Sequence, residues 1–445
     1  MSTLDSSMVN IALPVIMKQF HSPLPVTEWV VLIYLLTITS SLLFWGHISD
    51  RFGRGRIYAG GMFIFALGSL ACAVSPSLVL LIFSRLVQAV GAAMMMSTGP
   101  ALIREIFPAE QLGRALGMIG ISVSLGLMTG PSVGGFLLDL FSWRAMFLIT
   151  VPIGIIFFFL AVRILPRTRH HRGAPIDWFG SLCWALFLSL VSLAISHATS
   201  TAWSIGRILL FLLPAGIFFI IFMRIEKKTG HPLLPLELFR QRFFIMGALS
   251  AVLSFMTLFS VIMLTPFYLD HIRQLPSATI GLVMMAIPAS IFIAAPLAGW
   301  LSDKVSSRRF IPTCGLLLST LGLLLLSQIT AGASLSSIGF RLALLGCGQA
   351  IFLSPNSSAV LSAMETTRVG TAAALLATSR NLGMLLGIGQ SALVFSIVFA
   401  SLTGGLDMKD FTPAHIEQFM SALKGAFWIA AITGIIGSAT SWLRE

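Results

Sequence analysis

Three ionisable side chains stand inside apolar stretches of the sequence, where a charge is energetically costly. Asp5 lies in LDSSMVNIALP, Arg85 in SRLVQAVGAA and Arg380 in TSRNLGMLLG. Such groups pair with one another or change protonation state, so they usually have a function. A low dielectric favours the neutral form of a carboxylate, whereas a nearby cation favours the charged form. We expect Asp5 to be the proton-binding carboxylate and Arg85 to couple its protonation to a change of shape. The alternative is that Asp5 is a solvated residue near a frayed N-terminus.

A second group of residues could form a latch at the ends of helices. GHISDRFGRGR runs from Gly46 to Arg56 and GWLSDKVSSRR from Gly299 to Arg309, so the pattern Gly-x-x-x-Asp occurs twice. The glycine lets neighbouring backbones approach, and the aspartate can cap a helix N-terminus or pair with an arginine. The alternative is that these charges only fix membrane topology. The candidate gate residues are Gly46, Asp50, Arg51, Gly53, Arg54 and Asp303.

The segment GLMTGPSVGG combines small residues at helical spacing with a proline. Gly126, Gly130 and Gly134 are four residues apart, so they lie on one helical face, and Gly135 follows directly. Small residues at this spacing permit tight helix contact, and Pro131 removes one backbone hydrogen bond and can bend the helix. The face predicts a close helix pair, with ordinary packing as the alternative role.

Several further residues could line a cavity between helices. Met94 to Met96 and the aromatic run Phe157 to Phe159 could form an adaptable apolar pocket. Ordinary packing is the favoured interpretation, because the chain contains 20 Met and 34 Phe. The candidate cavity residues are Asn10, Gln88, Met95, Arg380 and Asn381.

The elements that must position these residues are helices in a lipid bilayer. Hydrophobic residues make up 56% of the 445 residues and charged residues only 10%. Crossing the hydrocarbon takes about 20 mainly apolar residues per helix, and such stretches follow one another almost from end to end. The composition therefore predicts an all-α, multi-pass membrane protein.

Fourteen spans are predicted, arranged as six, two and six. We expect an N-terminal six-helix bundle over residues 1–164, a two-helix insert with basic connectors over 165–242, and a C-terminal six-helix bundle over 243–445. Recurrence of the Gly-x-x-x-Asp loop makes the two bundles copies of one unit, as in secondary transporters. The expected spans are 3–19, 28–46, 57–75, 78–102, 114–138, 144–164, 178–197, 205–224, 244–268, 279–300, 310–329, 336–355, 371–399 and 419–443.

The net charge of +12 predicts orientation rather than a nucleic-acid partner. Most of the 28 Lys and Arg residues fall in loops after even-numbered predicted spans and at the C-terminus, not in one patch. The positive-inside rule therefore predicts cytoplasmic termini in the inner (plasma) membrane. The sequence shows no metal-ligand spacing, phosphate-binding loop or nucleophile elbow, so we expect no enzyme activity, no metal and no cofactor, with a proton gradient as the energy source.

Together these motifs resemble the major facilitator superfamily, in particular its fourteen-span drug:proton antiporter branch of the EmrB/QacA type. GHISDRFGRGR resembles the loop between spans two and three, SRLVQAVGAA the arginine motif of span four, and GLMTGPSVGG the antiporter motif of span five. LDSSMVNIALP resembles the span-one motif of that branch, and WRAMFLITVPIG the start of span six. The resemblance covers nearly the whole chain.

The resemblance implies roles for individual residues. Asp5 would take part in proton coupling, Arg85 in proton transfer or binding-site electrostatics, and Asp50 with Arg51 and Arg54 in a cytoplasmic gate. The glycines and Pro131 would favour antiport. Ala89 follows Gln88 where the family usually has glycine, a change expected to affect packing only. Family members also carry about half a helix before LDSSMVNIALP, so we expect a truncated first span and Asp5 near the cytoplasmic rim.

The expected function is proton-coupled export of hydrophobic or cationic small molecules by alternating access, that is, multidrug efflux. One alternative is a dedicated exporter of a single metabolite or siderophore. Another is a membrane sensor or inactive remnant that transports nothing. The expected partners are the substrate, protons and the bilayer, and a periplasmic adaptor protein is an open possibility.

Overall fold

The computed structural model describes residues 1–106, 112–165, 177–198, 205–229, 241–304, 309–362 and 369–444, and these are almost entirely helical. The helices before the predicted insert are α1 (Ser2–Phe20), α2 (Leu24–Thr27), α3 (Trp29–Phe52), α4 (Arg54–Ala73), α5 (Leu78–Ile106), α6 (Leu112–Leu140), α7 (Trp143–Leu148) and α8 (Thr150–Ile164). The insert contains α9 (Trp178–Ala198) and α10 (Ile205–Lys228). The later helices are α11 (Arg242–Phe267), η3 (Tyr268–Ile272), α12 (Ser277–Met284), α13 (Ala286–Lys304), α14 (Phe310–Ser327), α15 (Leu335–Ser362), α16 (Val369–Thr403), η4 (Met408–Asp410), η5 (Pro413–His415) and α17 (Ile416–Trp442).

The number of membrane spans is the first point at which sequence and structure differ. Within the described residues, 12 helical stretches are long and apolar enough to cross a membrane. Neither α1 nor α6 is among them. Helix α1 carries Asp5, Asn10 and Lys18, which reduce its hydropathy, and only part of α6 has described side chains. The chain is a multi-pass membrane protein, and the predicted fourteen spans are not confirmed.

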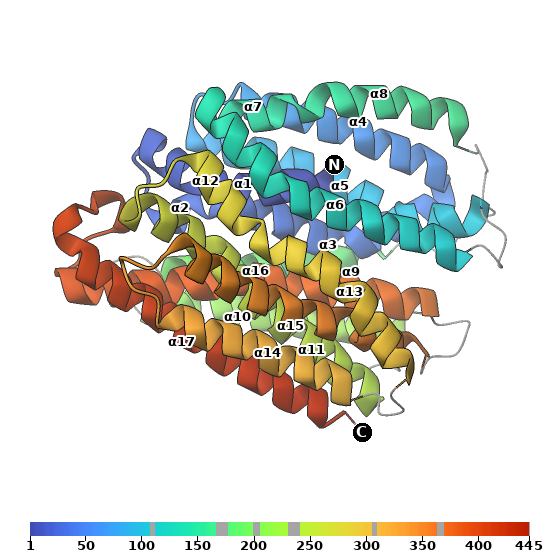
Figure 1. The fold of residues 1–445 in the computed structure, drawn as a ribbon. Coiled ribbons are helices and arrows are strands. Elements are labelled where there is room, and N and C mark those ends of the chain that lie inside the picture. The colour runs from blue at the N-terminus through green and yellow to red at the C-terminus, as the bar shows by residue number, and fades with distance from the viewer. Residues whose placement is uncertain are drawn as a thin grey trace.

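The helices form two halves that lie side by side. In Figure 1 the blue to teal helices α1 to α8 occupy one half, and the yellow to red helices α11 to α17 occupy the other. Within the halves, α4 packs on α5 and α8, and α14 packs on α15 and α17. The main helix contacts between the halves are those of α3 with α16 and of α6 with α12, and smaller ones join α1 to α11, α6 to α13 and α2 to α16. Movement of one half against the other must therefore change these contacts.

Glycines reveal the same helix pairing in each half. In the first half, a Cβ on Gly61 of α4 would lie 2.8 Å from the carbonyl oxygen of Gly91 on α5. A Cβ on Gly68, two turns along α4, would lie 2.5 Å from the backbone nitrogen of Gln88. Both glycines are thus required for the close approach of α4 to α5.

The second half repeats this pairing between α14 and α15. A Cβ on Gly315 would lie 2.7 Å from the carbonyl oxygen of Gly348, and one on Gly322 would lie 2.9 Å from the backbone nitrogen of Leu345. The spacing of the glycines is the same on both pairs of helices. The internal repeat predicted from the loops therefore extends into the packing of the helices.

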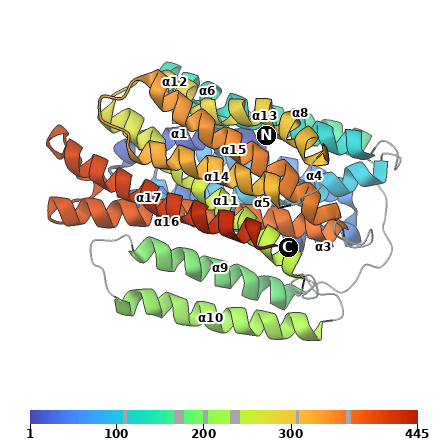
Figure 2. The same cartoon turned by 60° about the horizontal axis from the view of Figure 1, so that its bottom comes forward.

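The insert lies on one flank of the two halves. Figure 2 shows the green helices α9 and α10 side by side along that flank. Helix α9 packs on both α3 and α16, so it covers one junction between the halves, and α10 packs on α9. The side chains of Trp184 and Phe222 stack between the two insert helices, with ring centroids 5.3 Å apart.

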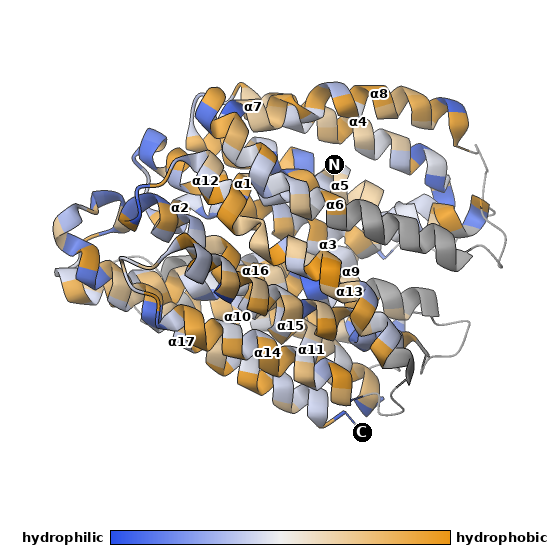
Figure 3. Ribbon diagram, in the orientation of Figure 1, coloured by the Kyte–Doolittle hydropathy of each residue, from blue (hydrophilic) through white to orange (hydrophobic). Residues whose placement is uncertain are grey.

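The outer surface of the helices is apolar, as contact with lipid requires. Figure 3 shows hydrophobic residues along the helices and hydrophilic residues mostly towards their ends. Phe157 and Phe159 on α8 are 48% and 59% exposed. The alternative of a pocket wall does not hold for these two rings, because they face outward. Phe158 packs on Phe63 with ring centroids 5.2 Å apart.

Candidate functional site

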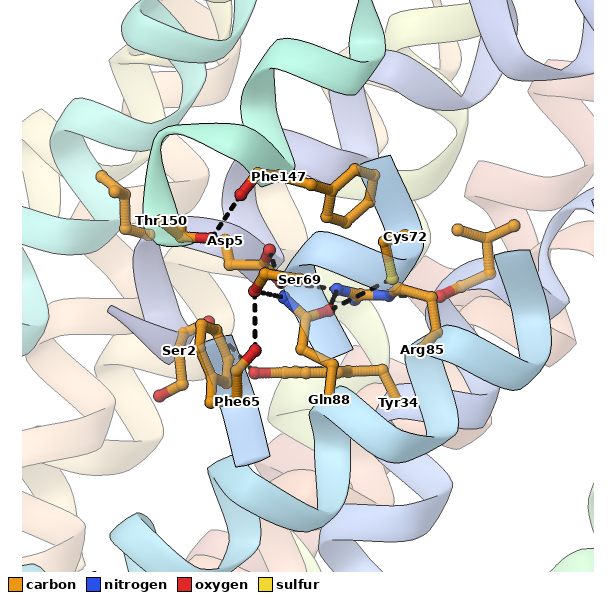
Figure 4. Close-up of polar contacts among 12 residues, drawn as sticks. Ser2, Asp5, Tyr34, Phe65, Ser69, Cys72, Arg85, Gln88, Phe147 and Thr150 are labelled. Atoms are coloured by element: carbon orange, nitrogen blue, oxygen red, sulfur yellow. Dashed lines mark hydrogen bonds and ion pairs between the residues drawn. The ribbon is translucent and has the colours of Figure 1, made fainter. Parts of the chain in front are cut away.

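A buried ion pair joins α1 to α5. Asp5 and Arg85 both have 0% exposure, and Arg85 Nη1 donates to Asp5 Oδ2 over 2.5 Å. Arg85 Nε donates to the carbonyl oxygen of Val30 on α3 over 3.0 Å. One guanidinium therefore holds three helices together in the first half (Figure 4).

Gln88 completes the coordination of Asp5. Its Nε2 donates to Asp5 Oδ1 over 2.9 Å and to Ser69 Oγ over 2.7 Å, while its Oε1 accepts from Arg85 Nη1 over 2.6 Å. The Ser69 hydroxyl in turn donates to the carbonyl oxygen of Phe65 over 2.8 Å. Each oxygen of the Asp5 carboxylate thus accepts a hydrogen bond from a different residue (Figure 4).

Aromatic rings enclose the guanidinium. Arg85 Cζ lies 4.1 Å from the ring centroid of Tyr34 and 5.7 Å from that of Phe147. A cation over an aromatic face is stabilised most where water is excluded. The Nη2 atom of Arg85 is buried and has no hydrogen-bond partner among the described residues. In this conformation the Nη2 group of Arg85 can therefore still donate a hydrogen bond.

The position of Asp5 differs from the expectation. It does not lie at a solvated rim, because its side chain is fully buried. Thr3, two residues earlier, packs against Gly126, near the middle of α6. The alternative of a frayed N-terminus is also wrong, since α1 is helical from Ser2 onward. Helix α1 therefore brings the carboxylate into the interior of the first half.

The second half has no equivalent of this polar network at the matching positions. The repeat of the glycine contacts aligns Leu342 with Arg85 and Leu345 with Gln88. Both leucines have 0% exposure and pack in the apolar core. The duplication thus conserves helix packing but confines this ion pair to the first half.

The glycine face of α6 packs directly on α1. A Cβ on Gly126 would lie 2.6 Å from Thr3 Oγ1, and one on Gly130 would overlap Ser7 Oγ. A Cβ on Gly134 would lie 3.1 Å from Met8 Cα. The prediction of a tight helix pair is confirmed in geometry, and its partner is the helix that carries Asp5.

The next residues of α6 contact the other half of the molecule. Gly135 faces the carbonyl oxygen of Ser277 on α12, and Gly281 of α12 faces the carbonyl oxygen of Pro131, at distances too short for a Cβ on either glycine. The carboxylate of Asp139 accepts from the backbone nitrogens of Ser277 and Ala278 over 2.9 and 2.8 Å. Helix α6 therefore joins both α1 and the N-terminus of α12.

A second contact between the halves lies at the same end of the molecule. Lys18 Nζ of α1 lies 2.5 Å from Asp270 Oδ2 of η3, and His271 Nδ1 lies 3.0 Å from the same oxygen. Next to the pair is a cavity of about 580 Å³. Its lining includes Met17, Lys18, His21, Asp270, His271, Gln274, Leu275, Met408, Lys409, Phe411 and Pro413. We call this end of the molecule the Lys18 end.

The predicted gate residues lie at the opposite end, here called the Arg54 end. Gly53 separates α3 from α4 with φ of 98°, a conformation that strongly favours glycine. Arg54 Nη1 lies 3.7 Å from Glu105 Oε2 on α5 and 3.4 Å from the carbonyl oxygen of Ala101. Arg51 is exposed, with its guanidinium 5.8 Å from the ring centroid of Phe52.

The side chains of two predicted gate residues lie outside what the structure describes, and a third residue makes no close contact in this conformation. Asp50 and Asp303 lie on helices α3 and α13, but their side chains are outside the described residues. At Gly46 an added Cβ would meet no atom of the described residues within 4 Å, so no close helix approach is seen there in this conformation. The latch itself stays a prediction.

The candidate cavity residues occupy several helices. Gln88 belongs to the Asp5 network, and Met95 is buried on α5 against Gly61. Asn10 Oδ1 on α1 and Asn381 Nδ2 on α16 are buried without a hydrogen-bond partner among the described residues. Arg380 Nε donates to the carbonyl oxygen of Leu376 on its own helix over 3.3 Å. Their role as a cavity lining stays a prediction.

One buried carboxylate was missed by sequence reasoning. Glu28 lies between α2 and α3 with 0% exposure, and neither Oε1 nor Oε2 has a hydrogen-bond partner in the described parts of the chain. It stands at the first residue of a predicted span, where a solvated side chain is the ordinary expectation. Pro23 and Pro25, five and three residues earlier, were the available signal, because they mark the start of the short helix α2 that precedes α3.

Comparison with known proteins defines the family. The chain is 35% identical to the riboflavin transporter RibZ of Clostridioides difficile over 439 residues, which cover 98% of this chain and 93% of RibZ. It is 30% identical to the methylenomycin A resistance protein of Streptomyces coelicolor, covering 88% and 83% of the two chains. It is 29% identical to the multidrug resistance protein Stp of Mycobacterium tuberculosis, covering 93% and 75%.

Solved structures show the same fold. A bacterial homologue of the human lysosomal transporter Spinster, inward-facing and unoccupied, superposes with a TM-score of 0.69 at 15% identity, over 100% of this chain and 94% of that one. Its inward-facing and occupied form gives a TM-score of 0.65 at 14% identity, over 100% and 93%. A sequence model of the Major Facilitator Superfamily matches residues 1–388, and the chain therefore belongs to this superfamily of transporters.

Proposed function

We propose that this transporter is a proton-coupled antiporter that exports hydrophobic or cationic small molecules by alternating access. The buried pair of Asp5 and Arg85 carries the proposal. Protonation of Asp5 removes its charge and leaves Arg85 without its ionic partner inside a low-dielectric interior. Arg85 also holds Val30 of α3 and Gln88 of its own helix. A proton on Asp5 therefore weakens the contact between α1 and α5 and changes the packing of the first half.

One route from this pair to the second half passes through α6. The helix that carries Asp5 lies against the glycine face of α6, and α6 contacts α12 through Gly135 and Pro131. A shift of α1 therefore acts on the contact of α6 with α12, in addition to the direct contact of α1 with α11. This contiguous packing supports antiport, in which proton binding and substrate binding favour different arrangements of the halves.

We further propose how the chain is organised and in which membrane it lies. We assign the chain to the fourteen-span antiporter branch, with α1 and α6 added to the 12 apolar spans. The assigned parts are bundles over 1–164 and 243–445 and an insert over 165–242. The Arg54 end and the C-terminus face the cytoplasm, and the membrane is the inner (plasma) membrane. The proton gradient replaces a cofactor, and a periplasmic adaptor is an additional partner to test.

A second candidate substrate class comes from the relatives. The similarity to a riboflavin transporter favours a dedicated carrier of one planar heteroaromatic metabolite, whereas the two resistance proteins favour drugs. Both candidates use the same proton-coupling residues. They differ in the range of compounds that should compete for transport.

The test uses purified protein in liposomes with an imposed pH gradient. Ethidium and riboflavin are the two probes, each measured with and without a protonophore. The expected result is gradient-driven flux of at least one probe in the wild type, abolished by protonophore and by Asp5→Asn. Glu417→Gln, which neutralises an exposed carboxylate at the start of α17, is the matched control and should transport normally.

The outcomes separate the candidates. Competition of many unrelated cations with ethidium supports multidrug export, and transport of riboflavin alone supports the dedicated carrier. Gradient-driven flux that is unchanged in Asp5→Asn would refute the assigned role of this carboxylate. Absence of flux for both probes in correctly inserted protein would refute both candidates as stated.

A further inference from the structure

The first half contains two buried carboxylates in opposite environments. Asp5 accepts hydrogen bonds at both oxygens and pairs with a cation. Glu28, also fully buried, has neither an ion pair nor a hydrogen bond to its side chain among the described residues. An ionised carboxylate without partners in such a place costs far more than a neutral one. Where two carboxylates of one site lie in contrasting environments, one is commonly ionised while the other is protonated.

The backbone around Glu28 shows that its burial is built in. Its amide nitrogen donates to the Leu24 carbonyl oxygen over 3.0 Å, and its own carbonyl oxygen accepts from Val31 over 2.9 Å. The dihedral angles of Glu28 are helical, so α2 continues into α3 and fixes the direction of the side chain. Thr27 offers no donor, because its hydroxyl bonds to Pro23 and Ser22.

Charged groups on the surrounding helices are engaged elsewhere. Helix α2 packs on α1, α3, α9 and α16, and α3 packs on α5. None of the described charged groups on these helices pairs with Glu28. Lys18 forms an ion pair with Asp270, and Arg85 forms one with Asp5. The carboxylate of Asp177 accepts a hydrogen bond from the backbone nitrogen of Gly180, and the guanidinium of Arg380 donates one to the carbonyl oxygen of Leu376.

From this geometry we infer that Glu28 is a second proton-binding site, which holds a proton while the Lys18 end is closed. Helix α2 belongs to the first half and contacts α16 of the second half beside that end. Opening of the Lys18 end separates these helices and admits water, in which the carboxylate can ionise. Closure over an ionised Glu28 would bury an unpaired charge, so a proton must bind before the end can close. The inference deepens the proposed antiport by making protonation a condition for one conformational step.

Infrared spectroscopy tests the protonation state without any transported substrate. The protonated carboxyl C=O stretch is measured on purified wild type, Glu28→Gln and the control Glu417→Gln at neutral pH. The expected result is loss of one carboxylic acid band in Glu28→Gln and no loss in the control. An unchanged band in Glu28→Gln would overturn the proposal. Should Glu28→Gln prove unstable, Glu28→Met, neutral and of similar volume, gives the same comparison.

A distance measurement tests the link to closure. Spin labels at Val79 and Leu335, exposed residues near the starts of α5 and α15, report the separation of the halves at the Lys18 end. We expect the wild type to shift to longer distances as pH rises, and Glu28→Gln to stay closed over the same range. An identical pH response in both proteins would overturn the inference. Absent transport in the wild type would count against the proposed function alone, because neither measurement here depends on flux.

Discussion

Lys18 and Asp270 connect the two halves of the transporter across one end, with 2.5 Å between Nζ and Oδ2. Lys18 is 55% exposed, so the pair is screened by water and its contribution to stability is at most about 1 kcal/mol. That amount still changes the ratio of two conformations roughly fivefold. We expect Lys18→Ala to lengthen the distance between spin labels at Val79 and Leu335 without lowering the melting temperature appreciably. Lys409→Ala, which changes another residue of the same cavity, is the control. Equal distances in the wild type and both variants would show that the Lys18–Asp270 pair does not hold this end closed.

Removal of one member of the buried ion pair should be severe. Arg85→Met leaves the buried Asp5 without its cation, and breaking such a pair costs about 3–5 kcal/mol. The double variant Asp5→Asn with Arg85→Met removes both charges, so we expect it to recover part of the lost stability. Thermal unfolding in detergent measures this. Arg380→Met is the control, since that guanidinium bonds within its own helix. A double variant less stable than Arg85→Met would show that the charge is not the cause.

The contact between α6 and α1 should tolerate no added methyl group. In Gly130→Ala the new carbon would overlap Ser7 Oγ, so the helices must separate. Overpacking of this kind costs about 1–3 kcal/mol. Gly216→Ala on α10 is matched in chemistry but meets no atom within 4 Å. We expect a lower melting temperature for the first variant only, and equal melting temperatures would contradict the tight packing.

The turn between α3 and α4 depends on the backbone of one glycine. Gly53 has φ of 98°, and a side chain there costs about 1–3 kcal/mol. Gly46, seven residues earlier, is helical with open space around it, so alanine there should be neutral or slightly stabilising. Melting temperatures of Gly53→Ala and Gly46→Ala are expected to move in opposite directions or to differ clearly. A similar small change in both would show that the turn adapts.

The sequence was most informative about single charged residues, because a charge in an apolar span is energetically costly. Asp5 and Arg85 stood out because charges are rare in apolar spans, and the structure places them in direct contact. The glycine spacing on α6 predicted a tight partner but could not identify α1, because the partner depends on the tertiary arrangement. Glu28 was missed since burial at the edge of a span depends on how α2 turns inward.

Contacts between distant segments were also beyond the sequence. Lys18 and Asp270 belong to different halves, and each alone resembles an ordinary charge in a loop. The close contact expected at Gly46 is not seen in this conformation for a related reason, because a repeated motif does not specify which neighbour lies beside it. Local composition therefore predicted the class and the costly charges, whereas the junctions between the halves required coordinates.

The leucines that align with Arg85 and Gln88 affect how the protein responds to the membrane potential. The membrane potential exerts a force only on charge, about 2.3 kcal/mol per elementary charge moved through 100 mV. A displacement of α5 relative to α1 can carry part of the Asp5 and Arg85 charges through that field. The corresponding displacement of α15 moves Leu342 and Leu345, which carry none. Voltage should thus act asymmetrically on these matched positions, because it acts on the ion pair in the first half and not on the two leucines in the second, where α15 carries its charge at Arg341 instead.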